Sequence, residues 1–133
     1  MNEMQQKGCF YQNINIAAAA AGVGEIASIP NPEGADLIVT RLMIRTTNAG
    51  AGATQVDAGP AAGANVLNDT LLDGVAINAV GLVDNIKDKA AAGNAVEAVI
   101  WPANQFLTVS KSGGNAGSEI GIQGTVYVEY IRA

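Results

Sequence analysis

Histidine is absent from this chain of 133 residues, and cysteine occurs once, as Cys9. Without histidine the chain cannot form a Ser–His–Asp triad or a Cys–His pair, and it lacks a common ligand of zinc and non-haem iron. A single cysteine excludes an internal disulfide. We interpret Cys9 as an unreactive thiol near the terminus, with a contact residue as the alternative. The sequence therefore predicts a protein that is not an enzyme and holds no cofactor.

Charge is also scarce, and no basic stripe forms. Only 14% of the residues are charged, the net charge is −5, and the seven basic residues are scattered along the chain. Proteins that bind nucleic acid through its phosphates cluster their lysines and arginines, so we expect no nucleic-acid partner. The one run that resembles a targeting segment, residues 14–24, contains Asn15 and is too short to span a bilayer. We therefore expect no membrane partner, and synthesis in a cytoplasm without an export signal.

Aromatic residues make up 5% of the chain, which is few for a carbohydrate site. Trp101 could be a stacking platform for a sugar, but we expect it to close one end of the core. Four aspartates also recur at short intervals: Asp69, Asp73, Asp84 and Asp88. They could form a calcium or acid–base site, although their spacing fits no EF-hand loop. We interpret them as solvated residues in turns and expect no metal.

What the chain does contain is alanine, glycine and segments in which apolar and polar residues alternate. Alternation of this kind predicts strands, and glycine-rich segments between them predict turns. The predicted strands lie near residues 12–19, 23–29, 36–47, 54–58, 75–88, 96–102, 104–113 and 120–133. Between them we predict a helical turn at 66–74, capped by Asn65 and ended by Gly74, a turn or helix fragment at 89–94, and a hairpin loop at 111–117. Many short strands with little helix indicate an all-β fold, an antiparallel β-sandwich, and we prefer a jelly-roll-like arrangement over an immunoglobulin-like one.

Two of these strands are long enough to define a core face. Along 36–47 we place the even positions Ile38, Leu42 and Ile44 in the core. Along the last strand, the core face would consist of Ile120, Ile122, Val126 and Val128. Gly124 interrupts that strand, where glycine usually marks a bulge or a corner.

The first thirteen residues differ from the rest, since they are polar up to the aromatic pair Phe10 and Tyr11. We predict an N-terminal arm over residues 1–13 and a single β-sandwich domain over residues 14–133. The two aromatic residues would tie the arm down, either on the protein's own core or on a neighbour.

Because catalytic groups are missing, the function is expected to lie in surfaces. The odd positions of the strand 36–47 include Arg41, Met43 and Arg45, and the polar face of the last strand includes Thr125 and Tyr127. Arginine, methionine and tyrosine are enriched at interfaces between proteins. Together with the aromatic pair of the arm, these residues form the candidate interface.

Two segments also carry a family resemblance. "LLDGVAINAVGLVDNI" (71–86) and "ANQFLTVSKSGGNAGSEIGIQGTVYVEYI" (103–131) resemble the C-terminal half of small head proteins of tailed bacteriophages. In that family an "LIDG…G…DNI" segment precedes a "VTASKASG…AG…G…YVEYI" ending. The match covers about half of the chain.

The resemblance implies a capsid decoration or cement protein. Such a protein is a small β-sandwich, often a homotrimer, that sits on the outer capsid surface of the virion and clasps adjacent subunits of the major capsid protein. Several weak contacts acting together would then give lasting attachment. The alternative is a host-surface or carbohydrate-binding module of a virion fibre or spike, which would rely on Trp101 or a tyrosine.

Overall fold

The computed structural model describes residues 7–17, 26–51, 53–64, 66–88 and 96–133, and over these ranges it contains nine β-strands and no helix. The strands are β1 (Lys7–Asn15), β2 (Ala27–Pro30), β3 (Leu37–Ala49), β4 (Gln55–Ala61), β5 (Leu72–Ala76), β6 (Gly81–Asp84), β7 (Val99–Trp101), β8 (Phe106–Gly113) and β9 (Ile122–Arg132). The all-β prediction is confirmed.

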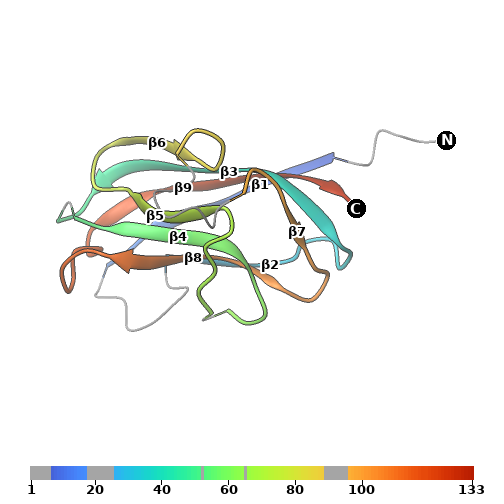
Figure 1. The fold of residues 1–133 in the computed structure, drawn as a ribbon. Coiled ribbons are helices and arrows are strands. Elements are labelled where there is room, and N and C mark those ends of the chain that lie inside the picture. Colours follow the sequence, from blue (N-terminus) through green and yellow to red (C-terminus); the bar gives the residue numbers. More distant parts are fainter. Residues whose placement is uncertain (1–6, 18–25, 52, 65, 89–95) are drawn as a thin grey trace.

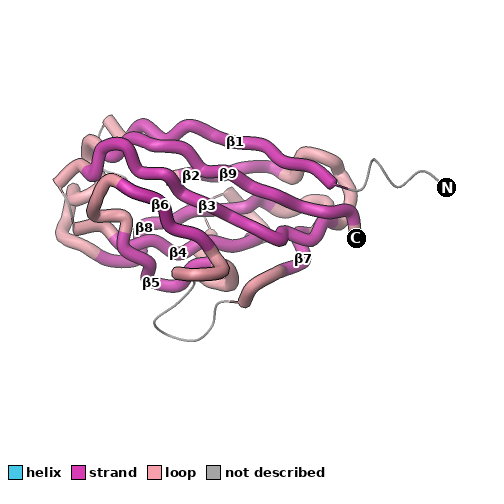
Figure 2. Tube along the Cα trace, turned by 90° about the horizontal axis from the view of Figure 1, so that it is seen from above, coloured by secondary structure: helices cyan, strands magenta, loops and turns pink. Residues whose placement is uncertain are grey.

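The strands form two antiparallel sheets that pack face to face (Figure 1). Sheet A has the order β1-β9-β3-β6, and β7 also pairs with β3. Sheet B has the order β2-β8-β4-β5. Figure 2 shows the molecule from the side of sheet A, with β1 along one margin.

The connections between the strands give the sandwich a jelly-roll topology. β1 pairs with β9, β2 with β8, β3 with β6 and β4 with β5, so the first half of the chain pairs with the second half, strand by strand. Successive strands lie in opposite sheets, except that β4 and β5 share sheet B and β6 and β7 share sheet A. The preference for a jelly roll is therefore confirmed.

Apolar side chains from both sheets fill the space between them. Trp101 belongs to this core and has no exposed surface. Its Nε1–H donates to the backbone oxygen of Gln105 at 3.0 Å, and its ring lies 6.0 Å from that of Phe10. Trp101 is thus a core residue, as expected, and offers no platform to a sugar.

The core-facing side of β3 changes along the strand. Leu37 and Val39 are fully buried and Ile38 is only partly buried, which is the reverse of the prediction. From Leu42 to Thr46 the even positions are buried, as predicted. The cause is a β-bulge at Thr40, which has no partner on β9, so the alternation of facing side chains is inverted there.

The last strand begins later than predicted. Ile120, which we placed in the core, is 42% exposed and lies in a turn before β9. The turn forms because the N–H of Ile122 donates to the Glu119 oxygen at 3.1 Å. The other three core positions predicted for β9 are confirmed: Ile122, Val126 and Val128.

Gly124 lies opposite a second bulge in β3, between Thr46 and Asn48. A Cβ atom at position 124 would approach the backbone oxygen of Arg45 to 2.0 Å. Only glycine fits at this point without displacing the neighbouring strand, which confirms that Gly124 marks a bulge.

Two predicted connections are wrong. No helical turn forms over residues 66–74, because Leu72 already begins β5 and the N–H of Leu71 donates to the Ala58 oxygen beside β4 at 2.8 Å. The segment 111–117 is not a hairpin loop either, since β8 lies in sheet B and β9 in sheet A. The loop instead carries the chain across the sandwich. Asn65 and the fragment at 89–94 lie outside the described residues.

The N-terminal boundary also needs correction. Residues 7–13, which we assigned to an N-terminal arm, belong to β1 and pair with β9 in an unbroken register from Lys7↔Ile131 to Asn15↔Gln123. The outward side chains of β1 are polar apart from Cys9 and Tyr11. This pattern resembles an arm in sequence, but it is also typical of an edge strand with one solvated face. Residues 1–6 lie outside the described residues.

The two sheets differ in what covers their outer faces. On sheet B, Thr108 Oγ1 donates to the Val66 oxygen at 2.9 Å and Ser28 Oγ donates to the Ala64 oxygen at 3.0 Å, so the segment between β4 and β5 lies over this face. Thr108 has no exposed surface as a result. No such segment of the described residues lies over the outer face of sheet A, which has exposed side chains on β1, β9 and β3.

Candidate interaction surface

Six of the seven predicted interface residues lie together on the outer face of sheet A: Tyr11, Arg41, Met43, Arg45, Thr125 and Tyr127. They come from β1, β9 and β3, which are adjacent strands. Tyr11 pairs with Tyr127, and Tyr127 with Met43, so these three side chains form one row across the sheet. Thr125 and Arg45 form the next row. We call this set the sheet A surface.

The row of Tyr11, Tyr127 and Met43 is the most apolar part of the sheet A surface. The two tyrosine rings are 6.3 Å apart between centroids and tilted by 43°, a geometry typical of favourable aromatic pairs. Tyr11 is 65% exposed although its ring is apolar. An open depression of about 630 Å³ follows the row, and Cys9 and Glu129 also line it.

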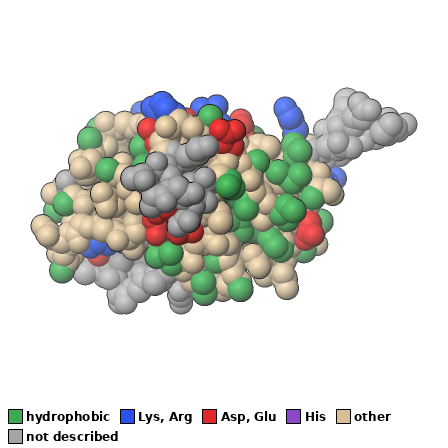
Figure 3. All heavy atoms as spheres, viewed as in Figure 1, with side chains coloured by type: hydrophobic (Ala, Val, Ile, Leu, Met, Phe, Trp, Pro, Cys, Tyr) green, Lys and Arg blue, Asp and Glu red, His purple; other side chains and the backbone are tan. Residues whose placement is uncertain are grey.

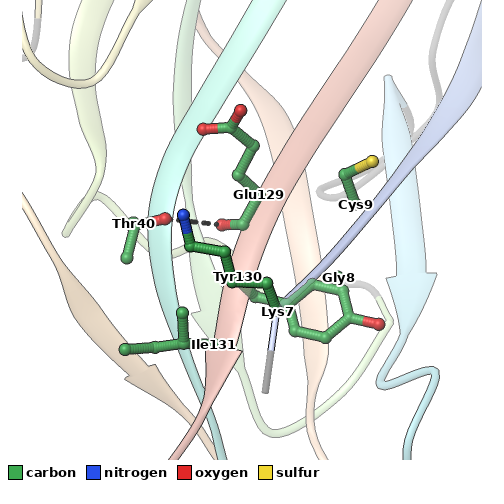
Figure 4. Close-up of a pocket in the computed structure, with 7 residues that line it drawn as sticks. All are labelled: Lys7, Gly8, Cys9, Thr40, Glu129, Tyr130 and Ile131. Carbon is green, nitrogen blue, oxygen red and sulfur yellow. Dashed lines mark hydrogen bonds between the residues drawn. The ribbon is translucent and has the colours of Figure 1, made fainter. Parts of the chain in front are cut away.

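A second depression, of about 390 Å³, continues along β9 toward its end (Figure 4). Lys7, Thr40, Glu129 and Ile131 contribute to its lining. Thr40 Oγ1 donates to the backbone oxygen of Glu129 at 3.2 Å, so the residue left without a partner by the bulge still contacts β9. Cys9 and Glu129 line both depressions, so the two depressions together form one shallow groove along β9.

The two arginines of the sheet A surface have different surroundings. Arg41 donates to Asp84 Oδ2 at 3.0 Å, and Asp84 also accepts the backbone N–H groups of Lys87 at 2.7 Å and Ile86 at 2.8 Å. These hydrogen bonds hold the pKa of Asp84 below its ordinary value, and the one from Lys87 contributes most. Burial acts in the opposite direction and raises the pKa. Arg41 is therefore fixed, whereas Arg45 is exposed and has no ion-pair partner among the described residues.

Basic side chains gather over sheet A in the space-filling view as well. In Figure 3, which keeps the view of Figure 1, Lys and Arg side chains lie along the upper margin, where the strands of sheet A run. Glu129 provides an exposed acidic group on the same face. The sheet A surface is thus apolar along one row and mixed in charge beside it.

Phe10 is the predicted interface residue that lies elsewhere. It points into the sandwich, where its ring lies 6.0 Å from Trp101 and 6.1 Å from Tyr130. Neighbouring residues in a strand face opposite sides, so Phe10 fixes β1 to the core while Tyr11 faces outward. Phe10 therefore ties this strand to the protein's own core, which was the first of the two predicted alternatives.

Three exposed apolar residues near this face were missed by sequence reasoning. Leu82 is 49% exposed and pairs with Arg45, and Ile100 is 59% exposed and pairs with Ile38. Val80 is 71% exposed and lines a third depression together with Leu82. Their alternation was visible in the sequence, but the strand that each short segment would join was not.

The four aspartates do not form a shared site. Asp84 and Asp88 do meet, because the Asp84 N–H donates to Asp88 Oδ2 at 3.0 Å within one turn. The described parts of the chain hold no group of three or more His, Cys, Asp or Glu side chains that could bind a metal ion. Within those same ranges, no helix has the length and apolar character needed to cross a bilayer.

A comparison of the chain with protein-family models, with curated proteins and with solved structures finds no match in any of the three.

Proposed function

We propose that this chain is a structural virion protein that decorates a phage capsid by placing the sheet A surface against the major capsid protein. The observation that carries the proposal is the contrast between the two outer faces. The chain covers the outer face of sheet B with its own segment, whereas sheet A presents Tyr11, Tyr127 and Met43 beside Arg45. The resemblance of residues 71–86 and 103–131 to phage head proteins supports the choice of partner.

The composition of the sheet A surface suits attachment to another protein. Tyrosine, methionine and arginine are enriched at protein interfaces, and a few buried aromatic or arginine side chains supply most of the binding energy. Lys7, Asn13 and Glu129 are exposed around the central row and would form a polar rim. A single surface of this size would bind weakly. Oligomerisation, which the resemblance predicts as a trimer, would multiply the contacts.

The proposal places the protein on the outer surface of the virion after synthesis in the host cytoplasm. It includes no catalysis, no cofactor, and no nucleic-acid or membrane partner. An acidic net charge of −5 supports it, because such a charge disfavours adhesion to packaged or free DNA.

The test is binding to capsids that lack the protein, measured by co-sedimentation. Tyr127→Ala and Arg45→Glu should each weaken binding by at least roughly tenfold, as expected when a central anchor worth about 1.4 kcal/mol is lost. Val66→Ala is the matched control, since Val66 is 47% exposed on the segment that covers sheet B. If both sheet A variants bind as well as the control, the proposed attachment face is wrong.

The glycan-binding alternative now rests on fewer residues. Trp101 is excluded as a platform by its burial, which leaves the exposed Tyr11 and the partly exposed Tyr127. Binding on a glycan array that disappears in Tyr127→Ala would favour this function over capsid decoration.

A further inference from the structure

The four margins of the sandwich differ in how they are protected. An exposed strand edge tends to pair with other chains unless it is short, bulged or interrupted by proline. β2 has four residues and ends in Pro30, β6 has four residues, and β7 has three. β5 has five, includes Gly74 with φ +67°, and pairs with β4 across a register shift.

β1 has none of these features. It has nine residues, no proline, a single charged residue at its start, and no register shift in its pairing with β9. It pairs on one side only and lies along the margin of sheet A (Figure 2). This margin is the long, regular edge of the described sandwich.

The backbone groups at this edge can be assigned by the ladder that β1 forms with β9. Ile16 follows the strand and donates its N–H to the Ile122 oxygen at 2.9 Å, in the same register. Antiparallel strands alternate, so the even-numbered residues of β1 bond to β9 and the odd-numbered residues point their N–H and C=O groups away from it. The residues with outward backbone groups are Lys7, Cys9, Tyr11, Asn13 and Asn15. In the described structure these backbone groups have no hydrogen-bond partner.

We propose that this edge is a self-association site, at which β1 pairs antiparallel with β1 of a second copy about a twofold axis through Tyr11. In this register Lys7 faces Asn15, Cys9 faces Asn13, and Tyr11 faces its own symmetry mate. All nine residues then find a partner, and any other symmetric register leaves some of them unpaired. Two copies of sheet A become one continuous sheet, with the same patch used by both partners.

The side chains fit a second copy of this chain. Lys7 is the one charged residue of β1, and the twofold register places it beside the uncharged Asn15, so no like charges meet. The row of Tyr127 and Tyr11 is doubled across the axis into four aromatic rings. On the inner side, Phe10 and Gln12 are only partly buried at the open edge, and the partner strand would cover them. The proposal does not depend on capsid decoration.

The first experiment is the native mass of the full chain in solution without any capsid, measured by light scattering. We expect twice the chain mass of 13.5 kDa. Asn13→Pro removes one outward N–H without touching the ladder to β9, so its mass should fall to that of one chain. Asn13→Ala is the matched control, since it also loses the side-chain contact with Thr125 but keeps the N–H, and it should remain a dimer.

A second pair of variants guards against misfolding of the proline variant. Tyr11 is 65% exposed, so Tyr11→Glu should fold, yet it brings two carboxylates together at the axis and should give a single chain. Tyr11→Gln should stay dimeric. The register is tested by Tyr11→Cys in a Cys9→Ser background, which should form an intermolecular disulfide under mild oxidation, because directly paired residues lie within disulfide range. In this register the native Cys9 faces Asn13, so the wild-type chain should not form an intermolecular disulfide under the same conditions.

A wild-type mass of one chain or of three chains would overturn the proposal, and so would a dimer that persists in both Asn13→Pro and Tyr11→Glu. A trimer would favour the state that the phage resemblance predicts. Because capsids are absent from these measurements, their outcome is separate from that of the attachment test.

Discussion

At the scale of single residues, the ion pair of Lys111 and Glu119 is short and mostly buried. Lys111 Nζ lies 2.7 Å from Glu119 Oε2 and donates to the Asn115 oxygen at 2.7 Å. The Glu119 side chain is 2% exposed and that of Lys111 19%. Lys111→Met should therefore destabilise the fold by about 3–5 kcal/mol, because it removes the charge that Lys111 places 2.7 Å from a buried carboxylate.

The stability of these variants can be compared by urea denaturation. Lys111→Met combined with Glu119→Gln should recover part of the loss, since the charge is then removed from both sides. Lys87→Met is the surface control, because the Lys87 side chain is 72% exposed beside Asp88, and it should change stability by less than about 0.5 kcal/mol. Equal effects of Lys111→Met and Lys87→Met would contradict this account of the pair.

At the scale of elements, the loop between β2 and β3 is attached to β9 by Glu33. The Tyr130 hydroxyl donates to Glu33 Oε1 at 3.0 Å, and the Arg132 guanidinium donates to Oε2. The pKa of Glu33 lies below its ordinary value of 4.5, mainly because Arg132 donates hydrogen bonds to the carboxylate and to a smaller extent because Tyr130 does. A carboxyl group whose pKa is lower in the folded state stabilises the fold at higher pH.

The Glu33 contribution should be complete above the ordinary carboxyl pKa and vanish as the pH falls through the lower, folded value. Thermal midpoints measured from pH 7 downward should thus show Glu33→Gln below the wild type at neutral pH. The two curves should approach each other as the pH falls from 4.5 and converge below the lower, folded pKa, where Glu33 is protonated in both states. A gap that stays constant with pH would show that the contact acts without its charge.

The elements also show what sequence patterning reveals and what it hides. Alternation identified β9 and most of its core face, because a strand in a two-layer sandwich has one face in the core and the other in solvent, so its side chains alternate between the two. It failed at Thr40, since a bulge adds one residue without any change in composition. β4 was visible only as a weak strand, because it is buried on both faces from Val56 onward and has no alternation to read.

The candidate surface was predictable for a similar reason. Arg41, Met43 and Arg45 follow the bulge and share one face by period two, as do Thr125 and Tyr127. That the two sets lie side by side depends on pairing between β3 and β9, which are far apart in the sequence. The β1 edge was hidden for the same reason, since a strand is an edge only once its neighbours are known.

At the scale of the whole molecule, β9 holds the sandwich together. It lies between β1 and β3 and pairs with both along most of its length. A chain ending at residue 121 should fail to fold, because β1 loses the one strand with which it pairs among the described residues, and core residues such as Leu42 lose their cover. Near-UV circular dichroism of the buried Trp101 should then be lost. A chain ending at residue 132 is the control and should fold; cooperative unfolding of the shorter chain would contradict the prediction.

The pairing of Lys7 with Ile131 also determines how the sandwich bears mechanical load. A tension applied between the start of β1 and the end of β9 acts on one pair of residues at a time. The hydrogen bonds between the two strands would therefore break one after another, at low force. A tension applied along the strands in opposite directions, from the end of β1 and the end of β9, loads every pair together. If the sheet A surface attaches the molecule to its partner, as proposed, a load enters through three strands together and does not separate β1 from β9 one pair at a time.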